Sequence, residues 1–120
     1  RTLGTAEIAK HTRVTPGYLS KVLQTLARAG LVESNPGRAG GFRLTRPAEQ
    51  ISVLEVVNAV DAVERIRRCP LGLKSHKHTL CPLHRRLDQV AEMVERAYGE
   101  TTIAEIVAET TPVKALCESA

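Results

Sequence analysis

Hydrophobic residues recur at helical spacing in two stretches at the start of the chain. The first runs from Thr5 to about Thr12 with Ile8 on its apolar face, and it predicts a short helix capped by Thr5. The second begins at Thr15, a favourable cap, and ends before Gly30, a residue suited to the position after a helix. Its apolar positions are Leu19, Val22, Leu23, Leu26 and Ala27. Two short helices joined by a tight turn predict a helix-turn-helix.

The pattern then changes to two short apolar runs around a glycine-rich tip. Leu31-Val32 and Phe42-Arg43-Leu44 flank the sequence Pro36-Gly37-Arg38-Ala39-Gly40-Gly41. Glycine lets the backbone turn sharply and approach another surface closely, so the pattern predicts a β-hairpin. Arg38 lies at its tip, and Arg43 and Arg46 are expected on the returning strand. A helix followed by a basic, glycine-rich hairpin is typical of a winged DNA-binding domain.

The solvent face of the second helix and the hairpin supply the candidate DNA contacts. Short hydrogen-bonding groups and cations can reach base edges and phosphates. For any single helix residue, an ordinary solvated position is the stronger interpretation, and the adjacent hairpin is what favours DNA binding. The candidates are Thr15, Gly17, Ser20, Lys21, Gln24, Arg38, Gly40 and Arg43.

Two further apolar patterns follow the hairpin. The segment Ile51–Ala62 opens with the capping box Ser52-Val53-Leu54-Glu55 and is apolar on nearly every side, so we expect it to be buried core. A long helix is predicted from Pro82 to Tyr98, and its narrow apolar seam consists of Leu83, Leu87, Val90, Val94 and Ala97. Such a seam predicts pairing with a second copy of the chain, and packing on the chain's own head is the alternative.

A second capping box, Thr102 to Glu105, predicts a short helix ending near Glu109. The chain is therefore expected to be mainly α with a small β-wing, a winged helix-turn-helix head followed by a long dimerisation helix. The expected divisions are the head with its buried connecting helix at 1–62, a Cys/His loop at 63–81, the dimerisation and short C-terminal helices at 82–109, and a frayed tail at 110–120.

Composition narrows the class of protein. The 17 Lys and Arg residues exceed the 13 Asp and Glu residues, and the pI near 9.3 favours a polyanionic partner. No apolar run is long enough to cross a membrane. Three cysteines, an odd number, favour a reducing compartment, so the protein is expected in the cytoplasm. The first residue is not Met, and the chain is expected to be clipped at its N-terminus.

The loop before the long helix holds the remaining chemistry. Its possible metal ligands are Cys69, His76, His78, Cys81 and His84. Thiolate and imidazole bind zinc and iron–sulfur clusters, whereas a basic loop with unpaired cysteines is an equally good interpretation. Cys81 with His84 is the single pair that could serve an enzyme, and without an orienting group or oxyanion loop we expect no enzymatic activity.

The order of these elements resembles the Rrf2 family of bacterial winged-helix regulators. The resemblance rests on the helix-turn-helix, on Gly37-Arg38-Ala39-Gly40-Gly41-Phe42-Arg43-Leu44, on the segment Ile51–Asp61, and on the cysteine-bearing loop before a long helix. It covers about Thr5 to Glu109. Members of this family begin with an additional helix, which this sequence lacks. The resemblance implies a homodimer that binds palindromic promoter DNA.

The resemblance also implies a ligand set. Cluster-binding members of the family carry three cysteines and then a histidine, and these positions correspond to Cys69, Ser75, Cys81 and His84 in this chain. Serine replaces the second cysteine, and His76 or His78 is close enough in sequence to substitute for it. The ligand set implied is Cys69, Cys81, His84 and His76, holding a two-iron two-sulfur cluster, with zinc or no cofactor as alternatives.

The function predicted from these observations is that of a transcription repressor that binds promoter DNA as a homodimer and senses a cluster or metal in the Cys69–His84 loop. Two alternatives stay open. One is a cofactor-free DNA-binding regulator of the same family. The other is a winged-helix adaptor that binds other proteins and is stabilised by zinc.

Overall fold

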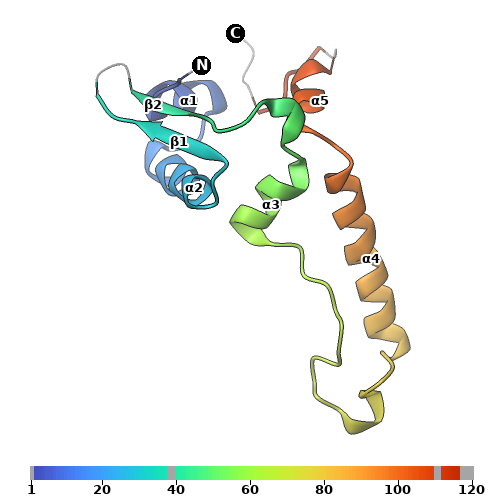
Figure 1. Ribbon diagram of the computed structural model, residues 1–120. Helices are drawn as coiled ribbons and strands as arrows, with labels where there is room; N and C mark the ends of the chain where they lie inside the picture. The colour runs from blue at the N-terminus through green and yellow to red at the C-terminus, as the bar shows by residue number, and fades with distance from the viewer. Residues whose placement is uncertain (1, 38–39, 110–111, 117–120) are drawn as a thin grey trace.

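The chain is mainly helical with a small two-stranded sheet, as the sequence predicts. The computed structural model describes residues 2–37, 40–109 and 112–116. The molecule is elongated, with dimensions of 60 × 32 × 25 Å. Figure 1 shows a small head of two helices and a hairpin on one side, and a long helix on the other. The loop that leads into this long helix lies at the end of the molecule away from the head.

The helix-turn-helix consists of α1 (Thr5–Thr12) and α2 (Pro16–Arg28). The N-cap of α1 is Gly4, so the prediction that Thr5 caps this helix is wrong, and Thr5 is instead its first residue. The extended backbone of Gly4 already accepts the first helical hydrogen bond, from Ile8. Thr15 is the N-cap of α2, as predicted, although its side chain makes no capping hydrogen bond.

The end of α2 leads directly into the hairpin. Gly30 has a φ of +79°, and its N–H donates to Ala27 while the N–H of Leu31 donates to Leu26. This is the Schellman arrangement, in which a left-handed residue after the helix satisfies its last carbonyls. Leu31 is buried at the point where the chain reverses. The helix end therefore fixes where the hairpin starts.

The wing is an antiparallel pair of strands, β1 (Val32–Asn35) and β2 (Gly41–Leu44). In its register Val32 faces Leu44 and Glu33 faces Arg43. Leu3 adds an isolated bridge to Phe42, with hydrogen bonds in both directions of 3.0 and 2.7 Å. Gly41 has a φ of +150°, and a Cβ there would lie 2.1 Å from the carbonyl oxygen of Leu3. Only glycine permits the N-terminal segment to approach the wing so closely.

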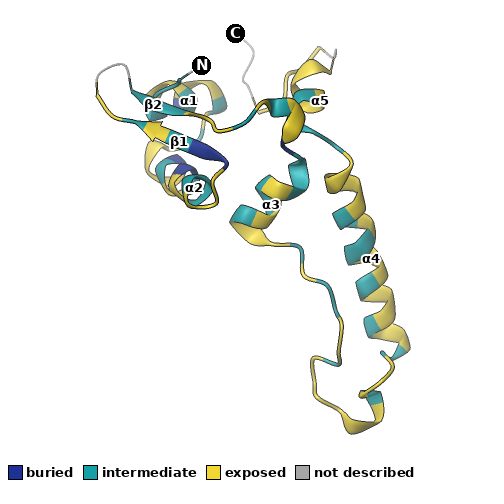
Figure 2. Cartoon of the chain, in the orientation of Figure 1, coloured by how far each residue is buried: buried dark blue, intermediate teal, exposed yellow. Residues whose placement is uncertain are grey.

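The hydrophobic core lies in the head. Ala9, Leu19 and Leu23 form its buried cluster, and Ile8, Val14 and Phe42 pack against it. Figure 2 shows the buried residues in the head and in the segment that leads into α3. In that segment Ile51 is 1% exposed and is the largest side chain, among those described, that is fully enclosed. The core thus joins the two helices of the head to the wing that follows them.

The short 3-10 helix η1 (Ala48–Gln50) leads into α3 (Val53–Asp61). The predicted capping box is present, since the Ser52 hydroxyl accepts from the Glu55 amide and the Glu55 carboxylate accepts from the Ser52 amide. The expectation that this segment is buried holds for Ile51 but is wrong for the helix. None of the nine residues of α3, all of them described, is buried, and Val60 is 48% exposed. The helix contacts α2 and α4, and these neighbours leave part of its apolar surface uncovered.

The remaining elements are the 3-10 helix η2 (Lys74–His76), the long helix α4 (Pro82–Gly99) and the short helix α5 (Ile103–Ala108). The starts of α3 and α5 form an isolated bridge between Ser52 and Thr102. Across it, the Val53 amide donates to Thr101 over 2.8 Å, and the Ile103 amide donates to Ile51 over 2.9 Å. The bonds satisfy one helix-start amide of each helix and bring together residues that are distant in sequence.

Candidate nucleic-acid interface and ligand loop

The outer face of α2 carries the predicted recognition residues. Thr15, Gly17, Lys21 and Gln24 are exposed, and Ser20 is half-buried. The Gln24 amide group lies 3.4 Å from the Ser20 hydroxyl, one turn back along the helix. The opposite face holds Leu19 and Leu23 in the core. The packing of α2 therefore turns these polar side chains outwards as one surface.

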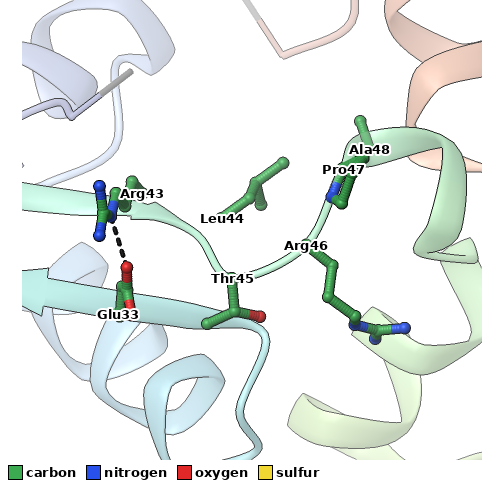
Figure 3. Close-up of a pocket in the computed structure, with 7 residues that line it drawn as sticks. All are labelled: Glu33, Arg43, Leu44, Thr45, Arg46, Pro47 and Ala48. Atoms are coloured by element: carbon green, nitrogen blue, oxygen red, sulfur yellow. Dashed lines mark hydrogen bonds and ion pairs between the residues drawn. The ribbon is translucent and has the colours of Figure 1, made fainter.

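The base of the wing is a hollow of about 540 Å³ that contains Arg43. Figure 3 shows the Arg43 guanidinium pointing across the two strands to the Glu33 carboxylate, with which it forms an ion pair. Both side chains are about half exposed, at 51% and 45%. The Arg43 guanidinium is therefore accessible at the surface, but its charge is already paired with the Glu33 carboxylate.

Arg46 does not lie on the returning strand, because β2 ends at Leu44. Its guanidinium donates to the Gln50 carbonyl over 3.0 Å and pairs with the Glu55 carboxylate at 2.6 Å. The Ser52 backbone N–H and then Arg46 lower the pKa of Glu55 below its ordinary value. Arg46 thus connects the wing to the start of α3.

Next to the tip of the wing, Gly40 packs closely against the end of β1. Gly40 is half-buried, and a Cβ there would lie 2.0 Å from the Asn35 carbonyl oxygen. Its N–H donates to Gly37 over 3.0 Å. Arg38, the predicted tip contact, lies outside the described residues, as does Cys117.

In the ligand loop, Cys69 and His76 line one hollow of about 350 Å³. The backbone N–H of Leu73, with those of Leu71 and Gly72, lowers the pKa of the Cys69 thiol, while burial acts in the opposite direction. The Nδ1 atom of His76 is buried and has no hydrogen-bond partner. Two predicted ligands therefore share one cavity.

Cys81 and His84 form a second pair at the start of α4. Cys81 is the N-cap of this helix, and its Sγ lies 3.4 Å from Nδ1 of His84. Within the described residues, no group of three or more Cys, His, Asp or Glu side chains is placed to hold one metal ion. The structure thus brings the four predicted ligands together as two separate pairs. As arranged, these donors do not fit a single four-ligand centre.

A cluster of ion pairs that sequence reasoning missed attaches this loop to α4. Arg65 donates to both carboxylate oxygens of Asp88, at 2.8 and 2.9 Å, and lies 3.4 Å from Glu95. The Ile66 amide also donates to Asp88 over 2.8 Å. The Arg65 guanidinium and then the Ile66 amide hold the pKa of Asp88 far below its usual range. The sequence signal that could have indicated this cluster is the helical spacing of three acidic residues on α4, namely Asp88, Glu92 and Glu95.

The predicted seam of α4 is largely open in the single chain. Leu83, Leu87 and Val90 are 62%, 48% and 57% exposed, and Met93 beside them is 67% exposed. Val94 is half-buried, on the part of the helix nearer to α5. Separately, none of the described helices combines the length and the apolar character needed to cross a membrane.

Comparison with known proteins places this arrangement among regulators. A family model described as Rrf2, iron-dependent transcriptional regulator, matches residues 1–109. The chain is 29% identical over 116 residues to the HTH-type transcriptional regulator YffB of Lactococcus lactis, covering 92% of this chain and 74% of that protein. It is 45% identical over 56 residues to the HTH-type transcriptional regulator IscR of Cereibacter sphaeroides, covering 47% of this chain and 36% of that protein.

Solved structures show the same fold. The structure of CymR, described as the global cysteine regulator of B. subtilis, has a TM-score of 0.72 at 20% identity and covers 92% of this chain and 81% of that chain. T. potens IscR has a TM-score of 0.68 at 22% identity and covers 87% of this chain and 67% of that chain. The matched family and relatives are transcriptional regulators, which confirms the expectation that the protein is not an enzyme.

Proposed function

Because the chain belongs to the Rrf2 family of DNA-binding transcriptional regulators, we propose that it is a repressor that binds palindromic promoter DNA as a homodimer. The observation that supports this best is the outward face of α2, where a polar surface lies on a helix whose other side is fixed in the core. A recognition helix needs this combination, since its base contacts depend on a rigid support.

The proposed contacts divide into two groups. Gly17, Ser20 and Gln24 on α2 read base edges in the major groove, and Thr15 and Lys21 contact the backbone at its borders. The wing supplies Arg38, Gly40 and Arg43, of which Gly40 lets the tip approach the phosphates closely. Arg43 must exchange its Glu33 partner for a phosphate when DNA binds.

The exposed seam of α4 supports the homodimer. A row of leucine and valine side chains open to water is costly, and a second copy offers the same row in return. The radius of gyration of 18.4 Å also exceeds the roughly 14 Å expected of a compact domain of this length. Pairing would place two recognition helices on half-sites roughly 34–36 Å apart.

The ligand loop is proposed as the sensory segment, because it connects α3, which contacts the head, to α4. A two-iron two-sulfur cluster or zinc held by Cys69, Cys81, His84 and His76 is the form that family membership favours. The division of these residues into two pairs does not fit that form. The geometry favours a cofactor-free regulator, in which another ligand changes operator affinity by binding the two states unequally.

Anaerobic purification followed by visible absorbance and metal analysis separates these forms. A coloured protein with stoichiometric iron supports the cluster, and a colourless one with one zinc per chain supports the zinc form. Metal-free protein that still binds its operator supports the cofactor-free regulator. Metal-free protein that captures other proteins but no DNA would support the adaptor.

We also propose a cytoplasmic location, because a repressor binds promoters on the bacterial chromosome, which lies in the cytoplasm.

DNA binding is tested by selecting a site from a random duplex library and then measuring anisotropy with that site over a salt series. Lys21→Gln is expected to weaken binding about tenfold and to lower the salt slope by about one, because one phosphate contact is lost. The matched control is Lys114→Gln, an exposed cation that lies against α5. Equal losses in both variants, or recovery of no site at all, would contradict the proposed function.

A further inference from the structure

The cations of this protein are concentrated in the ligand loop and in the first turns of α4. Seven of its 17 Lys and Arg residues and none of its 13 Asp and Glu residues lie between 65 and 86. The rest of the chain therefore has ten cationic residues against 13 acidic ones. Figure 1 shows that this loop lies at the end of the molecule away from the helix-turn-helix and the wing. Apart from Arg65, which pairs with carboxylates of α4, the positive charge of this segment is thus available for a ligand other than the DNA that the head is proposed to bind.

Within this segment, the hollow that contains Cys69 is lined by cationic side chains. Its volume of about 350 Å³ falls in the range of small-molecule sites. Arg68, Lys74 and Lys77 line it together with Leu73, Gly72, Cys69 and His76. Leu73 gives the wall part of its apolar character, and three of the seven lining residues are cations.

These three cations have no acidic partner in the part of the chain that the structure describes. Arg43, Arg46, Arg65 and Arg96 each pair with a carboxylate, but among the described residues none pairs with Arg68, Lys74 or Lys77. Like charges that line one cavity repel one another unless an anion lies between them. In the same wall, the buried Nδ1 of His76 has no hydrogen-bond partner.

We propose that this hollow binds a small organic polyanion, a molecule that carries two or more phosphate or carboxylate groups. Arg68, Lys74 and Lys77 bind the anionic groups, His76 Nδ1 takes part in one further hydrogen bond, and Leu73 packs against the carbon skeleton. Binding the polyanion orders the loop between α3 and α4 and so changes operator affinity. This last step rests on the proposed function, whereas the binding itself does not.

Calorimetric titration of the full chain with pyrophosphate and with citrate tests the binding, with acetate at matched ionic strength as the monovalent reference. We expect saturable binding of one polyanion per chain. The double variant Lys74→Gln/Lys77→Gln should bind at least about tenfold more weakly, because two charge-assisted hydrogen bonds are lost. The control Arg85→Gln/Arg86→Gln removes the same charge from the same basic segment but outside the hollow, and it should bind within about twofold of the parent.

Binding by one probe and not by the other identifies the phosphate or the carboxylate class and supports the site. No saturable binding of either probe, or equal weakening in both double variants, would overturn it, since diffuse attraction to a basic surface would then explain the data. A third variant, Lys21→Gln/Arg43→Gln, should keep its polyanion affinity, and a loss there would place the site on the DNA-binding face. Failure of operator binding with intact polyanion binding would reject the proposed function and leave the site standing.

Discussion

At the scale of single residues, the wing depends on glycine at two positions where a side chain would collide with backbone. Gly40 lies against Asn35, and Gly41 lies against Leu3 with a positive φ. The positive φ and the contact with Leu3 act on the same residue, so the approach of the N-terminal segment and the shape of the wing are determined together.

Gly41→Ala is expected to destabilise the fold by about 2–3 kcal/mol, because the new Cβ would collide with Leu3 and the backbone would be strained. Thermal or urea denaturation measures this loss. Gly17→Ala is the matched control, since no atom lies within 4 Å of its Cβ position and α2 should gain slightly in helix propensity. A Gly41→Ala variant as stable as the Gly17→Ala variant would contradict this account of the wing.

In the proposed complex, Glu33 competes with the DNA phosphates for Arg43. Glu33→Gln should free the Arg43 guanidinium and raise operator affinity about two- to fivefold, the amount that a half-exposed ion pair contributes. The salt slope should steepen by up to about one, because the Glu33 carboxylate of the parent takes up a salt cation when Arg43 leaves it, and this uptake offsets the counterion that the phosphate contact releases. Glu49→Gln removes the same charge from an exposed position on η1, and it should leave both quantities unchanged if the effect is specific to the pair.

At the scale of elements, local signals predict where helices and strands lie but not which surfaces they cover. The caps at Thr15 and Ser52 and the glycine at Gly30 are set by neighbouring residues, and the structure confirms them. The exposure of α3 depends on which distant elements happen to cover it, and its apolar composition alone led to the wrong expectation.

In the ligand loop, too, the sequence predicts which residue types are present but not how they are arranged in space. The residue types of Cys69, His76, Cys81 and His84 were evident from the sequence, whereas their separation into two pairs depends on how the loop folds. The attachment of Arg65 to Asp88 spans 23 residues, and no local pattern near Arg65 indicated its partner. The outward face of α2, by contrast, follows from helical periodicity and could be read directly.

The pH dependence of this attachment follows from the lowered pKa of Asp88. A depressed carboxyl pKa contributes stability that is complete above its ordinary value of about 4, and that is lost as the pH falls further, through the lowered pKa. Protection of the Ile66 amide against hydrogen exchange, corrected for the intrinsic rate, should therefore persist at neutral pH and decline only in strong acid. Asp88→Asn should lose this protection at neutral pH, and Glu100→Gln should keep it. Unchanged protection in Asp88→Asn would show that Arg65 does not hold the loop.

At the scale of the whole molecule, the elongated shape and the open seam belong together. The core supports the head, while the far half of α4 and the loop present apolar and cationic surfaces to water. The proposed dimer covers the apolar surface and leaves the loop accessible to a ligand.

Leu87→Glu should dissociate the dimer, because it places a charge in the middle of the seam where Leu87 is 48% exposed in the single chain. Sedimentation velocity measures the mass, and circular dichroism should show that the helices remain. Operator affinity should fall at least about tenfold, since the two half-sites would no longer be bound as one unit. Gln89→Glu adds the same charge to an exposed position of α4 outside the seam, and it should remain dimeric. A dimeric Leu87→Glu variant would disprove this seam as the interface.

The bridge between Ser52 and Thr102 brings together the two ends of the segment that lies between these residues. The chain leaves the head at Ile51, passes through α3, the loop and α4, and returns to the same place, where two reciprocal hydrogen bonds fasten its ends together. A segment with adjoining ends can be exchanged for another without moving the rest of the fold. The loop between α3 and α4 can therefore change in sequence while both ends of the segment stay attached to the head, and in the proposed regulator this lets the same recognition helix serve a different sensory loop.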